Sequence, residues 1–158
     1  MATTLRRVDT LLDNYSADHQ NPTNQLIHLV CVPLIAWSVS AMLWAIPVPT
    51  GVLQPGAWAA LAMFVAWMAY WRLSRKLAMG MLVAFLAAIF LNHWIAQAWG
   101  VMALLWLGAG VFVVAWIGQF IGHKIEGKRP SFFTDLVYLL IGPIWTLRKL
   151  YTRVGWGT

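Results

Sequence analysis

Two long tracts without charged side chains constrain this chain more than any other feature of its sequence. No Asp, Glu, Lys or Arg occurs in the 53 residues between Asp18 and Arg72, or in the 47 residues between Lys76 and Lys124. Each tract is long enough for two membrane helices of about 20 residues joined by a tight turn. Most of a chain of 158 residues is therefore expected to lie inside a lipid bilayer.

The composition supports this interpretation and excludes an ordinary soluble domain. Hydrophobic residues make up 61% of the chain, charged residues only 10%, and the mean hydropathy is +0.69. The net charge of +6 comes from short basic clusters that border apolar segments, which is typical of cytoplasmic loops and argues against a nucleic-acid partner. The single cysteine, Cys31, can form no intrachain disulfide, and no removable signal peptide is evident. We expect one integral membrane domain over residues 1–158.

Four apolar segments predict transmembrane helices that pair as two hairpins. They are Leu26–Ile46, Ala57–Trp71, Leu77–Gln97 and Val101–Ile121. Helix breakers at 47–56 and a single glycine at 100 separate the members of each pair without adding charge. Basic residues mark the other connections, so the positive-inside rule places residues 1–25, the 72–76 loop and the 122–131 loop in the cytoplasm. The predicted fold class is an all-α, multi-pass integral membrane protein.

The last part of the chain, residues 132–158, has a shorter apolar stretch followed by a basic tail. Gly142 and Pro143 interrupt this stretch, which has basic residues on both sides. These features predict a re-entrant or interfacial helix pair that returns to the cytoplasmic face. A fifth full span with an external carboxyl terminus is the alternative. Small residues such as Gly108 and Gly110 also permit close helix contacts, including those of a homo-oligomer.

The first candidate site begins at the cytoplasmic edge of the first charge-free tract. His28 lies one helical turn beyond Asn24, so the two side chains share a helix face. His19 precedes them in a segment that contains Pro22 and can fold back. Pro33 removes a backbone donor near His28 and locally opens the helix. Two imidazoles and an amide are therefore expected to meet at the cytoplasmic end of the helix bundle. The alternative for His28 is a buried histidine that is hydrogen-bonded to the backbone.

The second candidate site lies where the fourth predicted span reaches the same face. Gln119, His123 and Glu126 share one helix face if the helix continues to Glu126, and an i, i+3 pair of His and Glu is a common way to present a metal ligand with a carboxylate. Three imidazoles, a carboxylate and no cysteine suit Zn(II), Fe(II) or Mn(II), and open coordination positions favour iron that handles oxygen. Alternatively, Glu126 pairs only with the nearby basic residues of a solvated loop.

His93 fits this scheme less well. It follows Leu77 by sixteen residues, or about 24 Å of helical rise, which places it toward the opposite membrane face. Either the helix is broken or tilted and His93 is a fourth ligand, or it is a structural histidine hydrogen-bonded between helices.

The segment from His19 to His28 with Pro33, and the segment from Gln119 to His123 followed by Glu126, Arg129 and Pro130, resemble the signatures of a small membrane family. That family is typified by the fungal enzyme for metabolism of phytosphingosine to odd-numbered fatty acids, and the resemblance covers nearly the whole chain. It implies an Fe(II)-dependent dioxygenase that uses O2 to shorten long-chain 2-hydroxy fatty acids by one carbon. The resemblance implies His19, His28 and His123 as ligands, supported by Asn24, Gln119 and Glu126.

A mechanism follows as a hypothesis. The carboxylate and hydroxyl of a 2-hydroxy acid would occupy two open positions on the metal, O2 would take another, and Lys128 or Arg129 would neutralise the carboxylate. The acyl tail would stay among the apolar spans. Two rival functions are a bis-histidine haem protein for electron transfer and a non-enzymatic lipid-binding scaffold.

Overall fold

A computed structural model describes residues 2–17, 19–49, 51–127 and 132–156 of the chain. The described residues form six α-helices and no strands. The helices are α1 (Ala2–Ala17), α2 (Pro22–Trp44), α3 (Ala57–Leu73), α4 (Arg75–Trp99), α5 (Val101–Glu126) and α6 (Phe132–Arg153). The predicted all-α fold class is therefore confirmed.

Each of the four predicted spans is a helix, and its ends lie close to the predicted ones. Asn21 caps α2, because its side-chain oxygen accepts from the backbone N–H of Thr23 at 2.9 Å, and Pro22 occupies the first helical turn. Helices α2, α4 and α5 are long and apolar enough to cross a membrane. Helix α3 has 17 residues, or about 26 Å of rise, slightly less than a hydrocarbon core of about 30 Å. Its crossing of the membrane stays a prediction.

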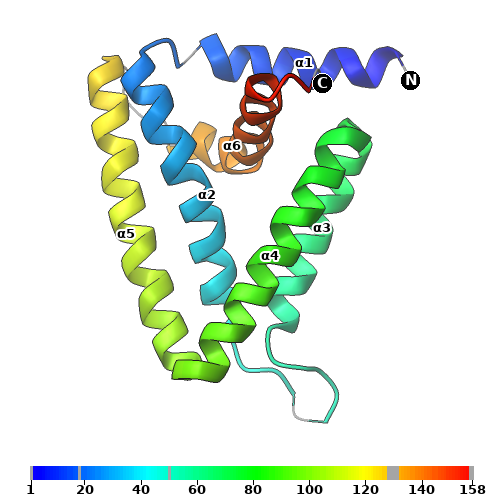
Figure 1. Cartoon of the computed structure of the whole chain (residues 1–158), viewed down its shortest axis with the longest axis vertical. Coiled ribbons are helices and arrows are strands. Elements are labelled where there is room, and N and C mark those ends of the chain that lie inside the picture. The colour runs from blue at the N-terminus through cyan, green and yellow to red at the C-terminus, as the bar shows by residue number, and fades with distance from the viewer. Residues whose placement is uncertain (1, 18, 50, 128–131, 157–158) are drawn as a thin grey trace.

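The helices form two packed pairs that diverge toward one end of the molecule. Figure 1 shows α2 beside α5 and α3 beside α4, with the α4–α5 turn at the far end. Small residues bring α2 and α5 close together: Gly108 lies against Ala41 and the carbonyl of Ser38, and Gly118 lies against Cys31. Gly108 thus serves a contact within the chain, whereas a Cβ atom at Gly110 would meet no other atom within 4 Å.

Helices α1 and α6 cross the open end of the two pairs, where α2 begins and α5 ends (Figure 1). A hydrophobic core joins them to α3 and α4, and its members include Leu12, Tyr70, Met81 and Ile144. The hydroxyl of Tyr70 donates to the backbone carbonyl of Leu140 at 2.8 Å, which fastens α3 to α6. This end of the molecule is therefore closed by two helices that lie across the bundle.

The predicted interruption at Gly142 and Pro143 is wrong. Helix α6 runs without a break from Phe132 to Arg153 and contains Pro143. A proline costs a helix one backbone hydrogen bond, but it does not end a helix whose flanking turns are packed on both sides. Here Gly142 lies against Val32 of α2, and Ile144 is buried in the core, so tertiary packing holds the helix through the proline. One helix replaces the predicted helix pair.

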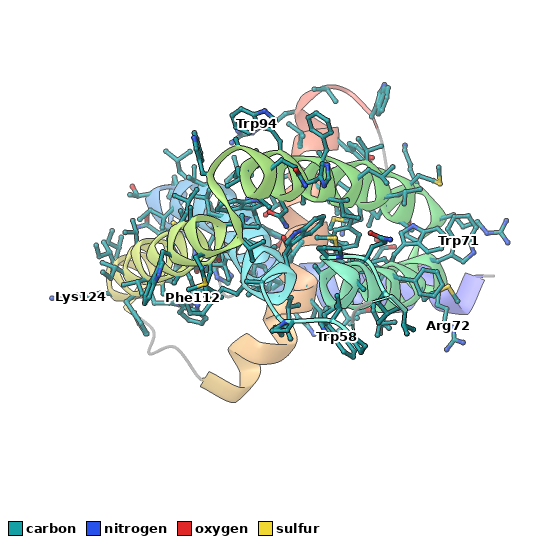
Figure 2. All side chains as sticks on the ribbon, turned by 90° about the horizontal axis from the view of Figure 1, so that it is seen from below. Trp58, Trp71, Arg72, Trp94, Phe112 and Lys124 are labelled. Atoms are coloured by element: carbon teal, nitrogen blue, oxygen red, sulfur yellow. The ribbon has the colours of Figure 1, made fainter. Side chains whose placement is uncertain are left out.

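Large apolar side chains cover the outside of the bundle. Figure 2, a view along the spans, shows Trp58, Trp94 and Phe112 pointing away from the helix axes, while Arg72 and Lys124 lie at the outer edges. Trp94 is 52% exposed, and many other exposed side chains on α2 to α5 are Leu, Val, Phe or Trp. Exposed apolar surface on this scale is what a lipid environment requires and what a water-soluble protein avoids.

Candidate metal centre

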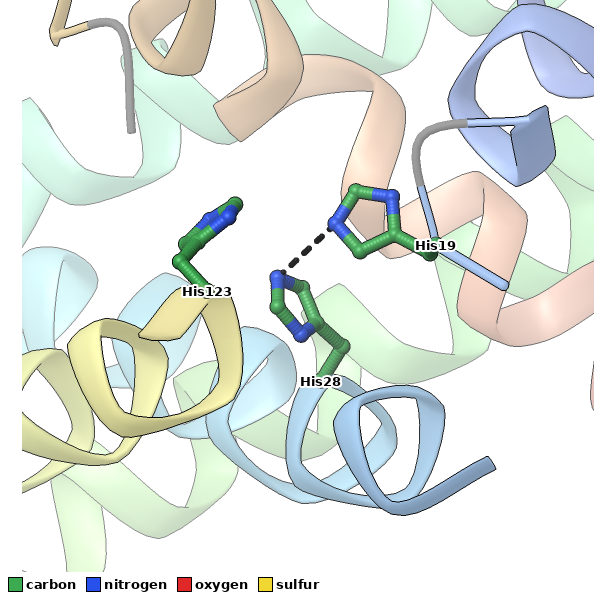
Figure 3. A group of neighbouring side chains, drawn as sticks. All are labelled: His19, His28 and His123. Carbon is green, nitrogen blue, oxygen red and sulfur yellow. Dashed lines mark hydrogen bonds between the residues drawn. The ribbon is translucent and has the colours of Figure 1, made fainter. Parts of the chain in front are cut away.

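Three histidines from distant parts of the sequence converge at the end of the bundle that α1 and α6 close. His19 lies in the short connection between α1 and α2, His28 lies on the second turn of α2, and His123 lies near the end of α5 (Figure 3). One ring nitrogen from each lies within 4.8 Å of the others. His19 and His28 are only 2% and 1% exposed, whereas His123 is half-buried. The structure therefore brings together three of the predicted ligands.

The backbone sets the orientation of two of these rings. The Nδ1 atom of His19 lies 2.7 Å from the carbonyl oxygen of Tyr15, and the Nδ1 atom of His28 lies 3.0 Å from the carbonyl oxygen of Asn24. A carbonyl oxygen only accepts hydrogen bonds, so each Nδ1 must carry the proton and each neutral ring must present a lone pair at Nε2. A metal-binding imidazole usually donates its second ring N–H to such an acceptor, a backbone carbonyl or a carboxylate.

The two Nε2 atoms face each other at 3.0 Å (Figure 3). Two lone pairs at this distance repel unless a cation, either a proton or a metal ion, lies between or beside them. Because the ring of His123 adds a third nitrogen to the same space, the donor set fits a metal ion that takes imidazole ligands.

Glu126 fastens the His19 segment to the end of α5. Its carboxylate accepts from the backbone N–H groups of Gln20 at 2.8 Å and Asn21 at 3.1 Å, and from the side-chain amide of Asn24 at 2.8 Å. A carboxylate at the start of α2 is also favoured by the helix dipole and forms strong, charge-assisted hydrogen bonds. Glu126 thus joins the segment that carries His19 to the helix that carries His123. Among the described residues, its partners are these groups and not the neighbouring lysine, Lys124.

The predicted supporting residues, Asn24 and Gln119, differ in the contacts that they make. Asn24 orients His28 through its backbone carbonyl, while its side chain binds Glu126. Gly122 makes this possible, because a Cβ atom there would collide with the Asn24 side chain. Gln119 is 5% exposed, and its amide nitrogen has no hydrogen-bond partner within the described residues. Backbone carbonyls, and not the predicted side chains, therefore hold the imidazole tautomers of His19 and His28.

The structure does not bring His93 to this cluster. The His93 side chain is exposed, and its ring centre lies 6.4 Å from that of Trp44, at the other end of α2. His28 and Trp44 are sixteen residues apart on one helix, which corresponds to about 24 Å of rise. The buried polar contact at this level is made by the preceding residue, Asn92, whose amide donates to the hydroxyl of Ser40 at 3.0 Å.

The sequence analysis did not predict the two aromatic side chains that pack beside His19, Tyr15 and Trp145. The ring of Tyr15 stacks on that of His19 with centroids 4.3 Å apart, and Trp145 of α6 lies 5.1 Å from Tyr15 and 5.9 Å from His19. The indole N–H of Trp145 donates to the hydroxyl of Ser16 at 2.9 Å. The spacing of Tyr15 and His19, four residues apart at the end of an amphipathic helix, was the available signal. No local signal indicated Trp145.

The predicted substrate-binding residues, Lys128 and Arg129, lie outside the described residues. A basic side chain that the structure does describe near the cluster is Lys149. Its ammonium lies 4.4 Å above the ring of Trp145 and donates to the side-chain oxygen of Gln25. The amide of Gln25 in turn donates to the carbonyl of His19 at 2.7 Å.

Comparison with known proteins gives two matches that agree. A profile of the family described as 2-hydroxy-palmitic acid dioxygenase Mpo1-like matches residues 5–154. The chain is also similar to the 2-hydroxy-palmitic acid dioxygenase MPO1 of Saccharomyces cerevisiae, with 27% identity over 143 residues that cover 89% of this chain and 78% of the yeast protein. No solved structure matches the chain significantly.

Proposed function

Because the chain belongs to the family of 2-hydroxy-palmitic acid dioxygenase Mpo1-like proteins, we propose that it is an Fe(II)-dependent dioxygenase that shortens 2-hydroxy fatty acids by one carbon. The observation that supports a metal-dependent reaction is the pair of buried Nε2 atoms, 3.0 Å apart, with a third imidazole beside them. Iron is the proposed metal because a site of few protein ligands with open positions suits Fe(II) and oxygen.

In this proposal the residues of the chain hold and orient the metal. His19, His28 and His123 would supply one nitrogen each, and the carbonyls of Tyr15 and Asn24 would keep the first two rings fixed through their Nδ1–H groups. When bound, Fe(II) would supply open positions for the hydroxy acid and O2 and the electrons that activate oxygen. Burial of His19 and His28 limits the access of water to the reacting groups.

The position of the cluster suits an amphiphilic substrate. The histidines lie at the end of the helices that are long and apolar enough to cross a membrane, so a fatty acid could keep its tail beside α2 and α5 while its polar end reaches the rings. Each buried methylene would contribute about 0.8 kcal/mol to binding. We propose that Lys128 or Arg129 neutralises the carboxylate, and that this end of the bundle faces the cytoplasm.

The haem alternative pairs His28 with a histidine on a facing helix, and His123 of α5 is in that position, with ring centroids 5.1 Å apart. The third imidazole, His19, points into the same space, which favours an ion held by three histidines over a haem held by two. The scaffold alternative requires a proton, in place of a metal ion, between the two Nε2 atoms.

The test is to load the purified full-length protein with Fe(II) without oxygen, and then to add O2 and 2-hydroxypalmitate. We expect a fatty product with one carbon fewer, identified by mass, and no product after loading with Zn(II). An overall balance of one hydroxy acid and one O2 giving the shorter acid, CO2 and water needs no other reductant. Consumption of oxygen in equal amount to product would support this balance.

His28→Ala and His93→Ala make a matched pair of controls, because both remove a histidine from an apolar helix. We expect His28→Ala to abolish product formation and His93→Ala to retain it. A Soret band in the active protein would instead indicate haem. Absence of bound metal in a folded protein that binds the hydroxy acid unchanged would indicate the scaffold.

A further inference from the structure

A groove between α1 and α6 carries positive charge that the described side chains do not fully balance. This α1–α6 groove has a volume of about 360 Å³, and its lining includes Asp13 and Ser16 of α1 and Trp145, Arg148, Lys149 and Arg153 of α6. Three cationic side chains and one carboxylate therefore line it. The groove lies at the end of the bundle that carries the histidine cluster, and Trp145 is shared by both.

The three cations differ in how they are paired. Arg148 lies 3.5 Å from Asp9 and 3.7 Å from Asp13, so its charge is more than offset, and the three cations and these two carboxylates leave a net charge of +1. Lys149 has only neutral partners, the ring of Trp145 and the side-chain oxygen of Gln25. Within the described residues, neither Lys149 nor Arg153 pairs with a carboxylate. Burial, and then the neighbouring charge of Arg153, lower the pKa of Lys149.

Lys149 and Arg153 lie where a lipid headgroup is expected, at the membrane surface and beside apolar side chains. Helix α6 lies across the ends of helices that are apolar enough to cross a membrane (Figure 1), which places the groove at the depth of the headgroups. Leu150 and Val154, next to the two cations in the chain, are 52% and 60% exposed and offer an apolar surface. A free inorganic anion gains no favourable contact with an apolar surface. A phospholipid presents an anionic group and acyl chains together, so it can contact both the cations and the apolar side chains.

We propose that the α1–α6 groove binds the phosphate group of a membrane phospholipid through Lys149 and Arg153. Arginine offers a planar fork of donors that matches phosphate oxygens, and lysine adds a compact charge. Basic pockets between helices at the cytoplasmic side of membrane proteins bind lipid headgroups in this way. The bound lipid would lie one side chain, Trp145, away from His19.

The test measures thermal unfolding of the full-length protein in a neutral detergent as short-chain lipids are added. We expect dihexanoyl phosphatidylglycerol, which is anionic, to raise the unfolding temperature in a saturable manner and to do so far more than dihexanoyl phosphatidylcholine. Arg153→Gln and Lys149→Gln should each weaken this binding by about fivefold. Arg153 is exposed, so its replacement leaves the core intact, and Arg153→Lys should keep most of the effect.

The matched control is Arg72→Gln, which removes one positive charge from the last turn of α3, outside the groove. It should leave lipid binding unchanged. Equal weakening by Arg72→Gln and Arg153→Gln would show that the attraction is only general charge and would overturn the proposal. Inorganic phosphate that stabilises the protein as strongly as the anionic lipid, at the same concentration, would also overturn it. None of these results depends on the metal or on catalysis.

Discussion

A histidine lies near each end of helix α2, His28 at its start and His93 of α4 beside its last residue, Trp44. Among the described residues, only the first end assembles a group of histidines that can hold an ion. At the first end, His28 faces His19 and His123, and two Nε2 atoms point at each other across 3.0 Å. At the other end, His93 is exposed, and its ring centre lies 6.4 Å from that of Trp44. The difference shows that a histidine in an apolar helix indicates a site only when backbone partners fix its free nitrogen toward other donors.

The largest difference between variants at the two ends of α2 is expected in metal binding. We expect Fe(II), added without oxygen, to raise the unfolding temperature of the wild type and of His93→Ala but not of His19→Ala. A metal at 100 times its Kd stabilises the folded state by about 2.7 kcal/mol, and loss of one of three ligands removes most of this effect. Thermal unfolding with Fe(II) or the redox-inert Zn(II) measures it. Equal shifts in the two variants would contradict the assignment of the first end as the metal centre.

A smaller loss of metal affinity is expected when the hydrogen bonds of Glu126, which join the His19 segment to α5, are weakened. Glu126→Gln keeps the size of the side chain, but it replaces one acceptor oxygen with an amide that faces N–H donors. We expect a loss of about 10-fold in metal affinity, as for other residues that hold a ligand in place, and of about 1 to 3 kcal/mol in stability.

Asp13→Asn is the control for Glu126→Gln, because it also neutralises one carboxylate near the same end. The Asp13 side chain is 71% exposed and lies 3.7 Å from Arg148, so its ion pair contributes little. Metal titration and thermal unfolding of the two variants compare them directly. If both lose metal affinity to the same degree, the role of Glu126 is only its charge and not its hydrogen bonds.

The smallest effect is expected at the opposite end of α2. Ser40→Ala removes the partner of the buried Asn92 amide, and hydrogen bonds between membrane helices contribute about 0.6 kcal/mol on average. We expect a loss of stability of that order and no change in metal affinity. Ser38→Ala is the control, since the Ser38 hydroxyl donates only within its own helix, to Ile35. A fall in metal affinity in Ser40→Ala would show that the two ends are coupled.

Much of the helical architecture could be predicted, because a long, continuously apolar tract in a membrane can satisfy all of its backbone hydrogen bonds within one helix. The predicted segments Leu26–Ile46 and Val101–Ile121 became α2 and α5 with shifts of a few residues. Pro143 was different. Local chemistry predicts a break there, but contacts of the neighbouring residues with α2 and the core hold one continuous helix.

The candidate site could be predicted in part. The position of His28 one turn after Asn24, and of His123 three residues before Glu126, correctly indicated that these groups lie at one end of the bundle. The partners of each group could not be predicted. Glu126 binds a segment more than a hundred residues earlier in the chain, and such a contact leaves no periodic pattern in the sequence.

The sequence by itself determined that this chain is built from apolar helices, because a long tract that is apolar on every face can satisfy its own backbone hydrogen bonds in lipid as a helix. It also determined that polar side chains gather where those tracts end. Only the tertiary structure decided which histidines meet. The rotation of α4 about its axis turns Asn92 inward and His93 outward, and the close approach of α2 and α5 at Gly122 places Asn24 against Glu126. These are consequences of packing between helices, which no single segment encodes.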